Sequence, residues 1–135
     1  MRLLLAGGDP HSRAVLAPAL NALGHEVVHT TANGPALVMA IARAEGLHAA
    51  VVGQHTLGKG WLRLLRLLRR QAPHLPVVVL LAPGTARSWR AAIMAGAFDA
   101  LPESRGRGAV LEAVSRALAF PVEAPRQHLA ARQAS

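Results

Sequence analysis

The glycine-rich stretch from Gly53 to Lys59 is the first place in this 135-residue chain where residue types and spacing suggest chemistry. Its sequence, Gly-Gln-His-Thr-Leu-Gly-Lys, matches the G-x-x-x-x-G-K pattern of a phosphate-binding loop, and an apolar run precedes it as that motif requires. Backbone N–H groups of such a loop bind phosphate oxygens, and Lys59 would add positive charge. Residue 60 is a glycine, however, where nucleotide hydrolases have the Ser or Thr that binds magnesium. The stretch therefore makes Gly53, Gly58 and Lys59 a weak candidate site for anion binding and argues against nucleotide hydrolysis.

A second motif, His25-Glu26-Val27-Val28-His29, spells the H-E-x-x-H of zinc metalloproteases. That chemistry needs a helix, which places both imidazoles on one face. Here Gly24 ends a helical pattern and the two valines favour a strand. In a strand the two histidines lie about 13 Å apart, at roughly 3.3 Å per residue, and cannot share one zinc ion. We therefore predict surface histidines on an edge strand and no metal site.

The residues around these motifs alternate between apolar runs typical of strands and amphipathic patterns typical of helices. Strands are expected at 2–6, 26–30, 49–52, 77–81 and 98–101, each followed by a helix. Strands joined by helical crossovers lie parallel, with helices on both faces of the sheet. We predict an α/β fold: a three-layer α/β/α, flavodoxin-like, doubly wound five-stranded parallel sheet in the order 2-1-3-4-5, with five helices.

This domain is expected to cover residues 1–120. The residues after Pro121 are rich in proline, alanine and arginine and lack a clear apolar period. We predict that residues 121–135 form a frayed helix or a disordered tail.

Several segments resemble the receiver domain of two-component response regulators. The clearest is Met94-Ala95-Gly96-Ala97-Phe98-Asp99-Ala100-Leu101-Pro102, and others are 3–6, 22–28 and 75–80. The resemblance covers roughly residues 1–120. It implies a signalling domain that carries a phosphoryl group on an aspartate at the end of the third strand. In such domains two acids after the first strand bind magnesium, a Ser or Thr ends the fourth strand, and a lysine follows the fifth.

The chain departs from the receiver pattern at each of these positions. Gly7 and Gly8 stand where the family has the acid pair, which leaves only the neighbouring Asp9. Gly53 stands at the position of the acceptor, Leu81 at that of the hydroxyl and Glu103 at that of the lysine. Glycine and leucine side chains can neither bind magnesium nor accept a phosphoryl group. No acid lies between Glu45 and Asp99, so a shifted alignment does not restore the acceptor. We predict a degenerate phosphorylation pocket (a pseudo-receiver) with no metal, no cofactor and no catalytic residue.

In the family, the surface formed by the fourth helix, the fifth strand and the fifth helix often mediates dimerisation and output. In this chain that surface would carry arginines and large apolar residues: Arg87, Trp89, Arg90, Met94, Phe98, Arg105, Arg107 and Arg116. Trp and Arg are residue types that anchor interfaces, although a solvated helix face accounts for exposed arginines equally well. We predict contact with a protein partner of a signalling pathway, or a homodimer, through this surface.

Composition bears on the remaining classes of function. The net charge is +8 and Lys59 is the only lysine, so a nucleic-acid partner bound by Arg63, Arg66, Arg69 and Arg70 stays open as an alternative. The chain has no cysteine, which excludes disulfides and thiolate metal sites, and its first apolar run is too short for a signal peptide or a membrane span.

The sequence thus predicts a cytoplasmic, non-enzymatic signalling module that acts independently of aspartyl phosphorylation and away from membranes. A phosphate or nucleotide sensor that uses the loop from Gly53 to Lys59 is the other alternative.

Overall fold

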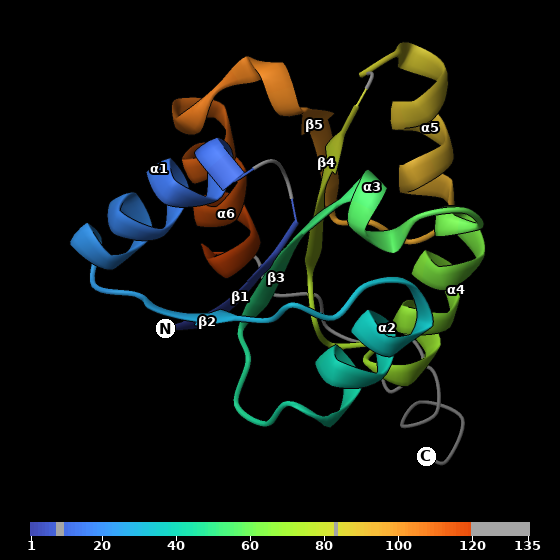
Figure 1. Cartoon of the computed structure of the whole chain (residues 1–135), viewed down its shortest axis with the longest axis horizontal. Helices are drawn as coiled ribbons and strands as arrows, with labels where there is room; N and C mark the ends of the chain where they lie inside the picture. The colour runs from blue at the N-terminus through green and yellow to red at the C-terminus, as the bar shows by residue number, and fades with distance from the viewer. Residues whose placement is uncertain (8–9, 83, 120–135) are drawn as a thin grey trace, which may run out of the picture.

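The structure of the protein, a computed structural model, describes residues 1–7, 13–82 and 84–119 in full and the backbone of residues 10–12. Five strands form one parallel sheet in the order β2-β1-β3-β4-β5 (Figure 1). They are β1 (Arg2–Ala6), β2 (Glu26–His29), β3 (Ala49–Gly53), β4 (Val77–Leu81) and β5 (Asp99–Pro102). The predicted fold class and strand order are confirmed.

Six α-helices occur in the described part of the chain, where the sequence predicted five. They are α1 (Pro10–Ala22), α2 (Gly34–Arg43), α3 (Gln54–Leu57), α4 (Trp61–Gln71), α5 (Ala86–Met94) and α6 (Arg107–Ala119), and a 3-10 turn η1 (Glu103–Arg105) precedes the last. The additional helix is α3, which forms one turn in the stretch that the sequence predicted as a loop. A single turn is too short to produce a hydrophobic period, so no sequence pattern indicated it.

Alternate residues of each strand divide the core into two layers. Leu3 and Leu5 face α1 and α6, whereas Leu4 and Ala6 face the layer of α2, α3, α4 and α5. Figure 1 shows α1 and α6 on one side of the sheet and α2, α4 and α5 on the other. All residues of β3 and β4 are buried, because helices cover both faces of these central strands. The three-layer arrangement is therefore the predicted one.

The parallel strands bring the ends of β1, β3 and β4 to the same edge of the sheet. Their register pairs Ala6 with Val52 and Gly53 with Leu80. Gly7, Gly53 and Leu81 consequently lie at neighbouring strand ends, where ligands of doubly wound sheets bind. This edge of the sheet is therefore where the fold favours a ligand-binding pocket.

Three predictions fall on residues outside the described ones: the roles of Gly8 and Asp9 and the nature of the tail at 121–135. The division into a domain of 120 residues and a tail stays a prediction. Among the described residues, no helix has the length and apolar character needed to cross a membrane.

The buried face of α4 yields a stability prediction. Leu68 is 1% exposed and packs in the core, whereas the side chain of Arg66 is exposed. We expect Leu68→Ala to lower the free energy of unfolding by about 2–5 kcal/mol, because it removes buried methyl groups and leaves a cavity. Arg66→Ala, on the opposite face, should change it by less than about 0.5 kcal/mol. Urea unfolding followed by circular dichroism measures both, and similar losses in the two variants would contradict this placement of α4.

Candidate functional site

The end of β3 is connected to the end of β4 by the side chain of Gln54. Gly53 closes β3 in an extended conformation, and Gln54 begins α3 directly after it. The Oε1 of Gln54 accepts a hydrogen bond of 3.1 Å from the backbone N–H of Ala82, the residue after β4. Leu57, at the other end of α3, is buried in the core with 1% exposure. One short helix therefore covers the sheet edge and holds two strand ends together.

The side chain of Thr56 fills the space beside Gly7. A Cβ atom at position 7 would lie 1.8 Å from the Oγ1 of Thr56 and 2.6 Å from its Cβ. Gly7 also has a φ of +91°, which L side chains rarely adopt. Position 7 has no room for a side chain in this backbone, so the residue after β1 cannot project a carboxylate into this space.

The described side chains at this edge offer few ligands for a cation. Gly53 has no side chain and Leu81 is buried and apolar, so neither supplies an oxygen. Glu103 starts η1, beyond the end of β5, and is half-buried. Within the described ranges there is no group of three or more His, Asp or Glu side chains that could hold a metal ion. What the arrangement provides is packing and hydrogen bonding between strand ends.

The G-x-x-x-x-G-K stretch does not form an open loop. Its residues 54–57 are the helix α3, and the N–H of Gly58 donates to the carbonyl of Gln54 at 2.9 Å. Lys59 is exposed, and Gly60 then adopts a left-handed conformation before α4 begins. A phosphate-binding loop directs successive free N–H groups at one point. Here part of that backbone is engaged in α3.

The H-E-x-x-H residues lie at the edge strand β2, as predicted. Glu26 and His29 are the first and last residues of β2, and His25 precedes it. The terminal ammonium of Met1 lies 3.4 Å from the Nδ1 of His25. Burial, and to a smaller extent this charge, lowers the pKa of His25 below its usual value. Two imidazoles on an extended strand do not converge on one metal ion.

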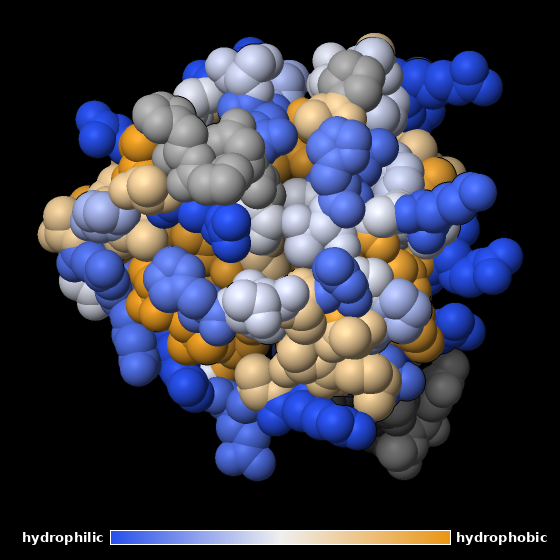
Figure 2. Space-filling view, viewed as in Figure 1, coloured by the Kyte–Doolittle hydropathy of each residue, from blue (hydrophilic) through white to orange (hydrophobic). Residues whose placement is uncertain are grey.

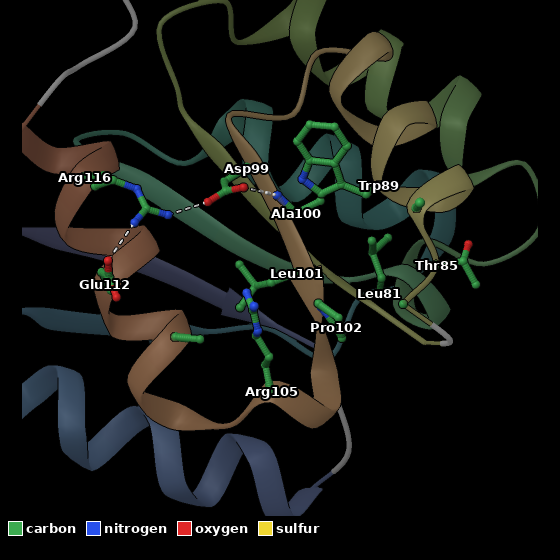
Figure 3. A pocket seen from close by; sticks show the side chains of 13 residues that line it. Leu81, Thr85, Trp89, Asp99, Ala100, Leu101, Pro102, Arg105, Glu112 and Arg116 are labelled. Atoms are coloured by element: carbon green, nitrogen blue, oxygen red, sulfur yellow. Dashed lines mark hydrogen bonds and ion pairs between the residues drawn. The ribbon is translucent and has the colours of Figure 1, made fainter.

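A hollow of about 450 Å³ lies between α5, β5 and α6 (Figure 3). Its wall combines apolar, basic and acidic side chains: Leu81, Trp89, Asp99, Leu101, Pro102, Arg105, Glu112 and Arg116. Figure 3 shows Trp89 and Arg116 on opposite sides of β5. Trp89 remains 47% exposed, which is unusual for a side chain of this size. The hollow thus lies in the surface that the sequence predicted as an interface.

An ion-pair network fixes one side of this hollow. The Oδ2 of Asp99 accepts from the Nη2 of Arg116 at 2.7 Å, and its Oδ1 accepts from the N–H of Ala100 at 2.8 Å. Arg116 also donates to Glu112, one helical turn earlier, at 3.1 Å. The Asp99 side chain is only 22% exposed, so its pairing is less screened than that of Glu112 at 74%. Arg116, which the sequence placed on the predicted interface surface, is engaged with two carboxylates.

The structure separates the other predicted interface residues into three groups. Trp89 and Arg105 line the hollow. Phe98 is half-buried and packs against the core layer of α1 and α6. The remaining ones are exposed on α5 and at the start of α6: Arg87, Arg90, Met94 and Arg107.

Sequence reasoning missed Asp99, Glu112 and Pro102 as parts of this surface. Glu112 and Arg116 are four residues apart, a spacing that signals a helical ion pair. The pairing of Asp99 with Arg116 joins residues of different elements, so no local pattern reveals it. Pro102 packs so closely on the backbone of Gly84 that a Cβ there would lie 2.5 Å from it.

The arginines of α4 form a second charged surface. Arg63, Arg66 and Arg70 are exposed, whereas Arg69 is half-buried, donates from its Nη1 to the carbonyl of Pro73 and packs beside Gly96. Arg69 therefore does not share the exposed face predicted for all four. Figure 2 shows strongly hydrophilic side chains projecting along the side of the molecule where Figure 1 places α4 and α5. The sequence has no acid from residue 46 to residue 98 to offset this charge.

No family model and no curated protein matches the sequence, but solved structures match the fold. A putative pilus assembly-related protein from Burkholderia pseudomallei is 22% identical with a TM-score of 0.74, over 88% of this chain and 90% of that one. A putative pilus assembly protein from Burkholderia thailandensis is 21% identical with a TM-score of 0.75, over 89% and 99%. A CheY-like response regulator receiver domain protein from Methanospirillum hungatei is 16% identical with a TM-score of 0.73, over 87% and 92%.

The fold is the receiver fold. This agrees with the resemblance noted in the sequence and with the observed strand order. At these identities the similarity establishes the fold, and the function has to be argued from the chain's own residues.

The contact between Thr56 and Gly7 predicts a coupling between two substitutions. Gly7→Ala should lower the free energy of unfolding by about 2–4 kcal/mol, because the new methyl group overlaps Thr56 and the backbone is left-handed. In a Thr56→Gly background the overlap is gone, and only the backbone cost of about 1–2 kcal/mol should remain. A double-mutant cycle measured by urea unfolding determines the difference. An equal cost of Gly7→Ala in both backgrounds would show that Thr56 does not fill this space.

Proposed function

We propose that this protein is a receiver-like signalling module that binds a protein partner and does not depend on aspartyl phosphorylation. One observation carries the proposal: the centre of the sheet edge where receivers hold their phosphoryl group is filled from within the chain. Gly53 stands at the end of β3, the position of the acceptor, and Thr56 occupies the space beside Gly7. Gln54 bridges the remaining gap to the end of β4.

The chemistry of phosphoryl transfer supports this reading. Transfer to an aspartate requires the acceptor carboxylate, a magnesium ion held by further oxygens, and a cation that offsets the developing charge. At the corresponding positions Gly53, Leu81 and Glu103 provide neither the acceptor nor the cation. The protein is accordingly proposed to be a degenerate receiver and not an enzyme.

The surface of α5, β5 and α6 is the proposed contact region. It combines a hollow of about 450 Å³ with Trp89, which is 47% exposed, and Met94, which is 79% exposed. Large apolar side chains next to arginines are characteristic of interface anchors, since they bury much area and add directional hydrogen bonds. The occupant is a protein partner in a signalling pathway or a second copy of this chain.

The structural neighbours are compatible with this type of function. Some are described as response regulators, and two as putative pilus assembly proteins, so chains of this fold occur in signalling and in assembly contexts. A cytoplasmic location is proposed on the same basis. For nucleic-acid binding, the only support on α4 is its three exposed arginines. Nucleotide sensing through residues 53–59 is disfavoured, because four of these residues form α3 and part of their backbone is already hydrogen-bonded.

Site-specific photo-crosslinking tests the proposed surface. A photoreactive amino acid would replace Trp89, which is 47% exposed, or Met39 of α2, which is 44% exposed and serves as the matched control. In native cells we expect position 89 to give a discrete cross-linked product, because a docked partner holds its atoms close, and position 39 to give none. A product at twice the chain's mass identifies a homodimer, and any other mass a distinct partner. Identical products from both positions, or none from position 89, would contradict the proposal.

A further inference from the structure

We propose that a hollow beside the end of β1 is a binding site for a phosphate-type oxyanion, either free or carried by a small metabolite. The hollow measures about 300 Å³ and is separate from the α5–β5–α6 surface. Its lining residues come from the position after β1, from α1, from the segment between β2 and α2, and from α3: Gly7, Arg13, Thr30, Thr31, Ala32, Asn33, His55 and Thr56. The inference does not depend on the proposed protein contact.

The lining is composed of hydrogen-bond donors. Arg13 carries a fixed positive charge, His55 an imidazole, Asn33 an amide, and three threonines hydroxyl groups, whereas none of the described lining residues is a carboxylate. A cavity that presents donors without acids attracts an anion and repels a cation. Phosphate, with several acceptor oxygens around one centre, matches such a set.

Arg13 is the central residue of the site. Its Nε is buried, yet has no hydrogen-bond partner among the described residues. Buried donors are rarely left without a partner, because a hydrogen bond to water is lost and not replaced. A guanidinium that lines a hollow, and whose Nε has no partner among the described residues, is suited to an oxyanion, which its planar donors can bind in pairs.

The segment between β2 and α2 contributes donors that the fold leaves available. The Oγ1 of Thr30 accepts from the N–H of Ala32 at 3.1 Å, which leaves the hydroxyl hydrogen of Thr30 to donate elsewhere. Asn33 is the N-cap residue of α2, but its side chain makes no capping hydrogen bond. The positive end of the α2 dipole also lies at this wall, since Asn33 lines the hollow and α2 starts at the next residue.

The size of the hollow limits the ligand. Small-molecule sites typically measure about 300–1,000 Å³, so this one is at the lower end and fits a phosphate with a short organic group. Lys59, the cation of the phosphate-loop motif, is not among the lining residues. The proposed site therefore shares His55 and Thr56 with that motif, but takes its fixed positive charge from Arg13 and not from Lys59.

Isothermal titration of the 135-residue chain with inorganic phosphate tests the site, at constant ionic strength maintained with sodium chloride. We expect saturable binding that Arg13→Gln weakens at least tenfold, about the effect of losing one charge-assisted hydrogen bond. Lys59→Gln, which removes an exposed positive charge outside the hollow, should change Kd by less than about twofold, as expected for a screened surface charge. Absence of saturable binding by the wild type, or equal losses in the two variants, would overturn the proposal.

Amide chemical-shift mapping of the wild type gives a readout that does not depend on the folding of a variant. On addition of phosphate, the shifts should concentrate at residues 30–33 and 55–56. Shifts confined to the exposed arginines of α4 would overturn the proposal, because they indicate non-specific association. Glycerol 3-phosphate, titrated in parallel, separates the two sources of the ligand: tighter binding than phosphate indicates a phosphorylated metabolite, and equal binding indicates the free ion.

Discussion

The packing of Thr56 against the bare backbone of Gly7 is the contact on which the rest of this structure's functional surface depends. It is possible only because position 7 has no side chain, and it brings α3 over the ends of β1 and β3. Gln54 extends the same cover to β4 through its hydrogen bond to Ala82. In a doubly wound sheet this edge is normally the ligand site. Here its centre is closed, and open space lies to either side: the donor-lined hollow near β2 and the larger hollow at β5.

The core explains why the candidate functional groups lie at the surface. Two apolar layers built from Leu, Val, Ala and Ile enclose the sheet, and no polar or charged residue is buried among the described ones. Ionised groups therefore lie outside this core. There a partly buried ion pair such as Asp99–Arg116 adds to the stability of the fold, whereas an isolated exposed arginine adds little. The chain keeps the rigid scaffold of a receiver while its charges and exposed apolar side chains provide possible contacts. The proposed partner contact and the proposed oxyanion site both use side chains that lie outside the buried apolar core.

Much of the fold could be predicted from the sequence because its signals are local. The run Val77–Leu81 was assigned its observed bounds, and β5 was displaced by one residue because Phe98, though apolar, packs before the strand begins. The helix α3 could not be predicted, since one turn leaves no period and depends on Leu57 reaching the core. For the candidate site, residue type alone showed that Gly53 and Leu81 carry no side chain that could bind a metal ion. The packing of Thr56 on Gly7, the packing of Arg69 on Gly96 and the ion pair of Arg116 with Asp99 could not be predicted, because those contacts join separate segments of the chain.

Treatment with acetyl phosphate and magnesium tests the central claim most directly. A phosphorylatable response regulator receiver, treated in parallel, shows that the reagent is active. For this protein, whose β3 ends at Gly53, intact-mass spectrometry should detect no phosphoryl adduct. An adduct that hydroxylamine removes, which is the signature of an acyl phosphate, would contradict the account at any position in the chain.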